Sequence, residues 1–164
     1  MTGPPPTHRG VGNDGQPHHS GSSIENHAAE SLWIQTAPGD TTIVAVPAEP
    51  ARLSMLRALS ETLCLTAGFG IGVANDIRLA VDEAASAMVP HRTPSTNITC
   101  EFAYDKQSIV VRVISISRDA TAFSGAELGW RLLRAVTDTL ETTRKAFDPR
   151  VSGYPAEVKF TRNR

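Results

Sequence analysis

The feature that most constrains the fold is a pair of segments in the second half of the chain. TNITCEFAY, residues 96–104, and SIVVRVISIS, residues 108–117, are both rich in β-branched residues, which is typical of β-strands. Only the short polar segment DKQ separates them. We therefore predict a β-hairpin at this point of the chain.

Two helices are predicted before this hairpin. In residues 49–68, leucines recur at helical spacing and Pro50 suits the first turn. After the loop GFGIG, Asn75 or Asp76 is expected to cap the second helix, and Pro90 to stop it. The apolar stripe of the second helix, which we expect to face the core, consists of Ile77, Ala80, Val81, Ala84 and Met88.

The remaining segments complete an α+β pattern. TTIVAVPA, residues 41–48, predicts a strand; ELGWRLLRAVTDTLE, residues 127–141, predicts an amphipathic helix; and residues 139–164 predict a last hairpin. The expected order is β-α-α-β-β-α-β-β. This order predicts a two-layer sandwich in which one mostly antiparallel sheet carries three helices on one face.

Composition separates a polar tail from this domain. Residues 1–30 contain almost no large apolar side chain, so we expect a disordered tail followed by one domain over residues 31–164. The formal net charge of −1 gives no electrostatic reason to expect nucleic-acid binding. Without a leader-like or membrane-spanning segment, a cytoplasmic location is expected. Cys64 and Cys100 are expected to be buried thiols, with a redox switch as the minor alternative, and no metal site is predicted.

LAVDEAASAMVPH, residues 79–91, raises the question of what Glu83 does. Helical spacing places Glu83 on the flank of the buried stripe, one turn before Ala87. A half-shielded carboxylate at this position could be a general base that orients a water molecule, or a metal ligand. Glu83 can equally be, with Asp82, the solvated edge of an amphipathic helix. Helical spacing alone favours this simpler interpretation.

Two motifs resemble the small anti-sigma-factor branch (RsbW- and SpoIIAB-like) of the GHKL, or histidine kinase-like ATPase, superfamily. LAVDEA is similar to the first nucleotide box of the family, L-A-V-D-E-A-x-x-N-A. GWRLLRAVTDTLE resembles the last helix of the family, G-L-x-L-[VM]-R-A-L-[AV]-D-x-[VL]-E. The residues at matching places in this helix are Gly129, Arg134, Ala135, Asp138 and Glu141. The expected order of elements also agrees with the GHKL (Bergerat-like) sandwich.

The resemblance implies an anti-sigma factor. Such a protein sequesters an alternative sigma factor and releases it by partner switching with an anti-anti-sigma protein, which regulates transcription. In the family both partners bind a face that includes the first helix. This would place Arg52 and Arg57 at the contact, although solvation is the simpler interpretation of both arginines. Members of the family also form homodimers.

Two alternatives to this function remain open. The first is an active serine protein kinase of the same family, which uses Mg-ATP to phosphorylate its anti-anti-sigma antagonist. The second is an α+β binding module with no such role.

The resemblance also assigns candidate site residues. Glu83 stands where the catalytic glutamate of the family polarises the attacking hydroxyl or water. Ala87 replaces the asparagine that ligates magnesium, and Ser115 or Ser117 stands where an aspartate binds adenine. Gly129 remains from the second glycine-rich box. Because Mg²⁺ demands oxygen ligands, which a methyl group lacks, we expect Mg-ATP to bind weakly or not at all.

Three further positions concern the phosphates of a nucleotide. Glu127 replaces a glycine of the second box, so a carboxylate would face the phosphates. Arg118 and Arg131 could contact phosphates in compensation, although solvation is again the simpler interpretation. A hydrogen bond to a charged group is worth about 1.5–3 kcal/mol, and about 1.4 kcal/mol is tenfold in affinity. Loss of the adenine and magnesium contacts is therefore expected to weaken nucleotide binding about a hundredfold or more.

Overall fold

The computed structural model describes Gly3 and residues 33–37, 41–120 and 128–164. Apart from Gly3, the tail expected over residues 1–30 lies outside the described residues. Short 3₁₀ turns precede α1 and follow α2. The described elements are β1 (Trp33–Ala37), β2 (Thr41–Pro47), α1 (Leu53–Thr66), α2 (Ile71–Met88), β3 (Asn97–Tyr104), β4 (Ser108–Ser117), α3 (Leu128–Val136), β5 (Thr139–Arg144) and β6 (Tyr154–Asn163).

The strands form one six-stranded antiparallel sheet in the order β1-β2-β3-β4-β6-β5. β3 and β4 pair as the predicted hairpin, in a register that places Glu101 opposite Arg112. The predicted last hairpin is also present, with β6 between β4 and β5. β1, an edge strand paired with β2, was not predicted. The α+β class and the antiparallel sheet are confirmed.

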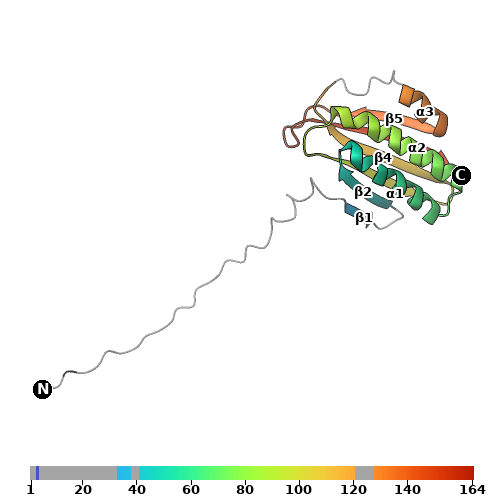
Figure 1. The fold of residues 1–164 in the computed structure, drawn as a ribbon, viewed down its shortest axis with the longest axis horizontal. Helices are drawn as coiled ribbons and strands as arrows, with labels where there is room; N and C mark the ends of the chain where they lie inside the picture. Colours follow the sequence, from blue (N-terminus) through green and yellow to red (C-terminus); the bar gives the residue numbers. More distant parts are fainter. Residues whose placement is uncertain (1–2, 4–32, 38–40, 121–127) are drawn as a thin grey trace.

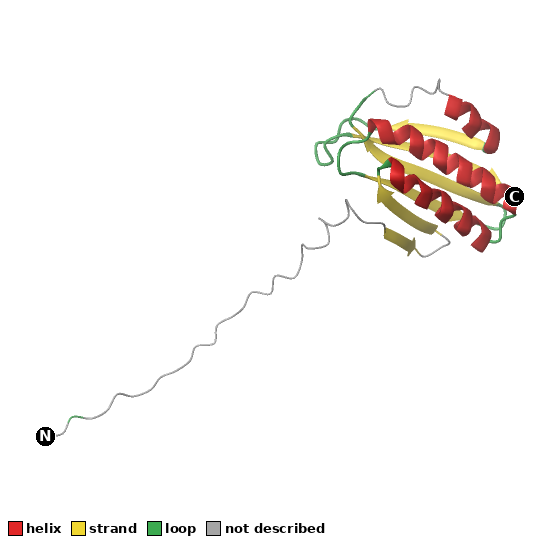
Figure 2. Ribbon diagram, in the orientation of Figure 1, coloured by secondary structure: helices red, strands yellow, loops and turns green. Residues whose placement is uncertain are grey.

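All three helices lie on one face of this sheet (Figures 1 and 2). α2 occupies the middle of the helical layer, where it contacts α1 and α3. The sheet meets this layer with alternate side chains, so Val111 and Val113 of β4 are buried and Arg112 between them is not. The predicted apolar stripe of α2 is confirmed, because every one of its members is at most 1% exposed.

The start of α2 differs from the prediction. The helix begins at Ile71, and its N-cap is Gly70, whose backbone is extended and which offers no side-chain cap. Asn75 and Asp76 therefore lie inside the helix, and Asp76 pairs with Arg162 of β6 at 3.0 Å. The prediction was wrong because it assumed a polar N-cap residue, whereas the helix begins directly after a glycine.

The end of α3 also differs. The helix expected over residues 127–141 ends at Val136, and Thr139–Arg144 is strand β5. Asp138 explains the change: its N–H donates to the carbonyl of Thr161 at 2.8 Å, and its carboxylate accepts from the N–H of Asn163 at 2.6 Å. These bonds attach the chain to β6 directly after the helix. Glu141, matched above to the last helix of the family, therefore lies on a strand.

The helix-free face of the sheet carries paired charges. Arg112 reaches Glu101 and Glu157 at 2.6 Å each, and Lys159 reaches Glu141 at 3.4 Å. The hydrogen bond from Arg112 lowers the pKa of Glu157 and, in the same way, raises the pKa of Arg112. Opposite charges thus face each other across neighbouring strands, which stabilises a sheet face that none of the described helices covers.

Both cysteines are buried free thiols, as predicted. Cys64 of α1 and Cys100 of β3 are each 0% exposed. Burial raises the pKa of the Cys64 thiol to about 11 and that of the Cys100 thiol to about 12. The thiolate is the reactive form, so both groups are expected to be unreactive near neutral pH.

We therefore expect a disulfide reagent such as DTNB to modify neither thiol of the folded protein rapidly at pH 8, and to modify both once guanidinium unfolds the chain. Above about pH 9 the unfolded chain ionises its thiols and the folded protein does not, so the free energy of unfolding should fall as the pH rises. Rapid modification of a thiol in the folded protein would contradict the burial described above.

Candidate functional site

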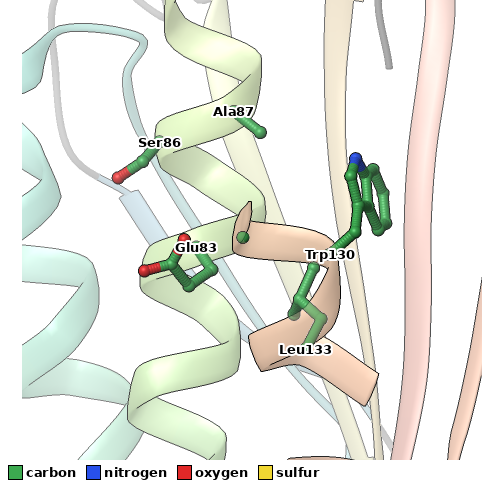
Figure 3. Close-up of a pocket in the computed structure, with 6 residues that line it drawn as sticks. Glu83, Ser86, Ala87, Trp130 and Leu133 are labelled. Carbon is green, nitrogen blue, oxygen red and sulfur yellow. The ribbon is translucent and has the colours of Figure 1, made fainter. Parts of the chain in front are cut away.

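A hollow lies between α2 and α3, and Glu83 of the LAVDEA motif is one of the residues that line it. Its volume is about 210 Å³. Figure 3 shows side chains of α2 and α3 around this space. The lining residues are Glu83, Ser86, Ala87, Gly129, Trp130 and Leu133. The structure thus brings three of the predicted site residues together from distant parts of the chain, namely Glu83, Ala87 and Gly129.

Glu83 and Gly129 are in close contact. A Cβ atom at position 129 would lie 2.7 Å from Oε2 of Glu83, much closer than side-chain atoms normally approach. The carboxylate therefore lies where the Cβ atom of any other residue would be, and it would have to shift if position 129 carried a side chain. This contact joins the two motifs that carry the family resemblance, one from α2 and one from α3.

The charge of this hollow is unfavourable for phosphate groups. Glu83 is the only ionisable side chain among its described lining residues, and it is a carboxylate. Neither Arg118 nor Arg131, considered above as substitute phosphate contacts, lines the hollow. Phosphoryl transfer depends on cations that neutralise developing negative charge. The described part of the hollow supplies no such cation.

The residues present do not fit a magnesium ion either. Ala87, at the position of the family's magnesium ligand, offers only a methyl group to the hollow. No group of three or more potential metal-ligating side chains (His, Cys, Asp or Glu) is found among the described residues. Glu83 and the exposed Ser86 leave this wall of α2 with one carboxylate and one hydroxyl. We derive no magnesium-dependent step for this site.

Ser117, predicted to replace the adenine-binding aspartate, does not line the hollow. Its hydroxyl lies 2.9 Å from the carbonyl oxygen of Asp119 and 3.2 Å from that of His91, and it accepts from the N–H of Asp119 at 3.0 Å. Ser117 therefore organises the end of β4. Ser115, the alternative, is 4% exposed, and its hydroxyl has no hydrogen-bond partner among the described residues.

The two arginines predicted to contact a protein partner lie at the start of α1. Arg52 faces Glu49 at 3.9 Å, and both side chains are about half exposed. Arg57 points to α2, where its Nε donates to Asp82 at 2.6 Å while 40% of its side chain stays exposed. The structure does not bring these arginines into the hollow. It does place Arg57 against the neighbour of Glu83 in the sequence.

Three lining residues were not predicted as part of the site. Ser86 lies one helical turn after Glu83, so helical spacing could have identified it. Trp130 follows Gly129 directly and is 5% exposed. Leu133 is an apolar residue of the helix predicted over residues 127–141, and no site role was predicted for it. The wall formed by α3 could not be placed opposite α2 from the sequence, because that contact depends on the packing of two distant helices.

No known protein-family model matches this chain, and no curated protein matches its sequence. None of the helices in the described part of the chain is both long enough and apolar enough to span a membrane.

Proposed function

We propose that this protein is an anti-sigma factor that acts by binding proteins rather than by phosphoryl transfer. It sequesters an alternative sigma factor in the cytoplasm, as a homodimer, and releases it when an anti-anti-sigma protein competes. One observation carries the choice between binding and catalysis: the hollow between α2 and α3 retains the contact of Glu83 with Gly129, but its described lining has no cation, and Ala87 stands where the magnesium ligand is expected.

The arrangement of elements supports the family on which this proposal rests. Without the edge strand β1, the observed order is the β-α-α-β-β-α-β-β order that the resemblance implies. The two motifs also meet in space at Glu83 and Gly129. Protein binding needs surfaces and not a loaded nucleotide site, so the loss of nucleotide contacts leaves this function intact.

The serine protein kinase is the second candidate. The position of Glu83 beside an open space favours it, because a general base needs room for the group that it activates. The absence of cations in the described lining opposes it. The two candidates differ most clearly in their response to Mg-ATP.

We expect calorimetric titration with Mg-ATP to show a dissociation constant weaker than about 1 mM. Ala87→Asn restores only one oxygen ligand, so this variant should still fail to phosphorylate an anti-anti-sigma protein. Micromolar binding, or strong phosphate transfer after this single substitution, would favour the kinase.

The binding function itself is tested by transcription in a purified system. RNA polymerase that carries the alternative sigma factor should lose activity at that factor's promoter when this chain is added. The chain should need no prior incubation with a nucleotide. Polymerase carrying the housekeeping sigma factor is the control and should be unaffected. Equal inhibition of both, or of neither, would contradict the proposal.

A further inference from the structure

A second hollow, of about 340 Å³, lies where β2 ends and β3 begins. It shares no residue with the hollow between α2 and α3. The residues that form its walls are Pro47, Ala48, Glu49, Pro90, Arg92, Pro94, Ser95, Thr96 and Arg118. Its lining differs in charge from that of the first hollow, because two arginines face this space.

The backbone holds these two arginines side by side. Arg92 forms an isolated antiparallel bridge with Ser117, the residue directly before Arg118. The N–H of Arg118 donates to the carbonyl of His91 at 2.8 Å, and the N–H of Thr93 donates to that of Ile116 at 2.9 Å. The segment after α2 is thus attached to the end of β4, which fixes the spacing of Arg92 and Arg118.

The guanidinium groups make hydrogen bonds but no ion pairs with the described residues. Nη1 of Arg92 donates to the carbonyl of Val89 at 2.8 Å, and Nη2 of Arg118 lies 3.4 Å from the carbonyl oxygen of Pro90. Such bonds satisfy carbonyls at the end of a helix, which is the simplest role for both side chains. They occupy only a small part of the donors of a guanidinium, and carbonyl groups bring no negative charge to it.

Six other arginines of the described residues contrast with this pair, because they face carboxylates. Arg57 is paired with Asp82, and Arg162 with Asp76 and Asp138. The remaining pairs of this kind are Arg52 with Glu49, Arg78 with Glu61, Arg112 with Glu101 and Glu157, and Arg150 with Asp148. Among the described residues that line the second hollow, Glu49 is the one carboxylate, and Arg52 faces it. The described lining of the second hollow therefore has an excess of positive charge.

The walls of this hollow are stiff. Three of its lining residues are prolines, whose rings fix the backbone dihedral φ. Thr96 is held by a bond from its hydroxyl to the carbonyl of Thr93 at 2.7 Å. Ser95 adds an exposed hydroxyl that can donate to a ligand. A site with fixed walls loses little conformational entropy when it binds a ligand.

We propose that the second hollow binds a phosphate group, held between the guanidinium groups of Arg92 and Arg118. Two planar guanidinium forks match a group that carries several oxygens and about two negative charges better than they match a single carboxylate. The phosphate can be a free ion or the end of a phosphorylated molecule, and the chemistry of recognition is the same. This inference is independent of the anti-sigma proposal, since it uses neither Glu83 nor α3.

The test is a titration of the full chain followed by NMR or calorimetry, with inorganic phosphate and with O-phosphoserine as the two probes. We expect saturable binding, and we expect Arg92→Gln and Arg118→Gln each to weaken it about tenfold or more. Lys106→Gln is the matched control. It also removes one positive charge, but in the turn at the opposite end of β4 from Arg118, and it should change the affinity less than twofold.

The outcomes distinguish a free phosphate ion from an esterified phosphate, and two of them would contradict the proposal. Tighter binding of O-phosphoserine assigns an esterified phosphate, and equal or tighter binding of inorganic phosphate assigns the free ion. No saturable binding of either probe, or an equal loss in Lys106→Gln, would overturn the proposal. Arg118→Gln removes only a 3.4 Å hydrogen bond from an exposed side chain, so it keeps the test valid if Arg92→Gln unfolds the protein.

Discussion

Replacing Phe160 with alanine is expected to lower the free energy of unfolding by about 3–5 kcal/mol. Phe160 is 0% exposed and lies on the helix-facing side of β6. Its register partners are Val111 of β4 and Leu140 of β5, so its ring fills the space between the sheet and the helical layer. Alanine removes that apolar contact and leaves a cavity that fixed strands on both sides cannot close.

Denaturant unfolding followed by circular dichroism measures this effect, and Lys159→Ala is the matched control. Lys159 is the preceding residue of β6, but its side chain lies on the helix-free face, where its pair with Glu141 is well exposed. Exposed pairs contribute about 0.2–1 kcal/mol. If Phe160→Ala lowers the free energy of unfolding no more than Lys159→Ala does, the assignment of the buried face of the sheet is wrong.

Reversing the charge of Arg57 is expected to weaken binding of the alternative sigma factor about thirtyfold or more, if α1 carries the partner contact. Loss of the partly exposed Arg57–Asp82 pair should lower the free energy of unfolding by about 1 kcal/mol, and the new glutamate beside Asp82 adds a like-charge repulsion of similar size. Affinity for the purified sigma factor and the free energy of unfolding are therefore measured together for Arg57→Glu.

A charge swap separates partner binding from a structural role. Arg57→Glu combined with Asp82→Arg restores an ion pair between α1 and α2 but leaves a negative charge on α1. We expect this double variant to regain stability and not affinity. If it regains affinity as well, Arg57 acts only by joining the two helices, and the partner contact lies elsewhere.

The elements that could be predicted from the sequence are those with local signals. The hairpin of β3 and β4 has β-branched strands on either side of a short polar turn, and α2 has an apolar stripe from Ile77 to Met88 that is buried throughout. The α3–β5 boundary could not be predicted in the same way. The helical pattern continues past Val136, and the hydrogen bonds that end the helix connect Asp138 to Thr161 and Asn163, distant in sequence.

Only part of the candidate site could be predicted from the sequence, because the rest depends on contacts between residues that are distant in sequence. Glu83 and Gly129 carry motifs that can be compared with a family, and the structure places them in contact. The charges around Glu83 and Gly129 depend on other side chains, which do not belong to any recognisable motif. Arg118 follows β4 at the end of the sheet and faces the second hollow, so it contributes nothing to the space beside Glu83. The sequence could not show which of the two spaces receives positive charge.

The proposed function requires that this chain hold a sigma factor through its surface and without a nucleotide. The most direct measurement is capture with the tagged full chain from a lysate of its source cells, with and without Mg-ATP, followed by quantitative mass spectrometry. We predict one alternative sigma factor in near-stoichiometric amount under both conditions. Capture that requires Mg-ATP, or the absence of any sigma factor under both conditions, would contradict this claim.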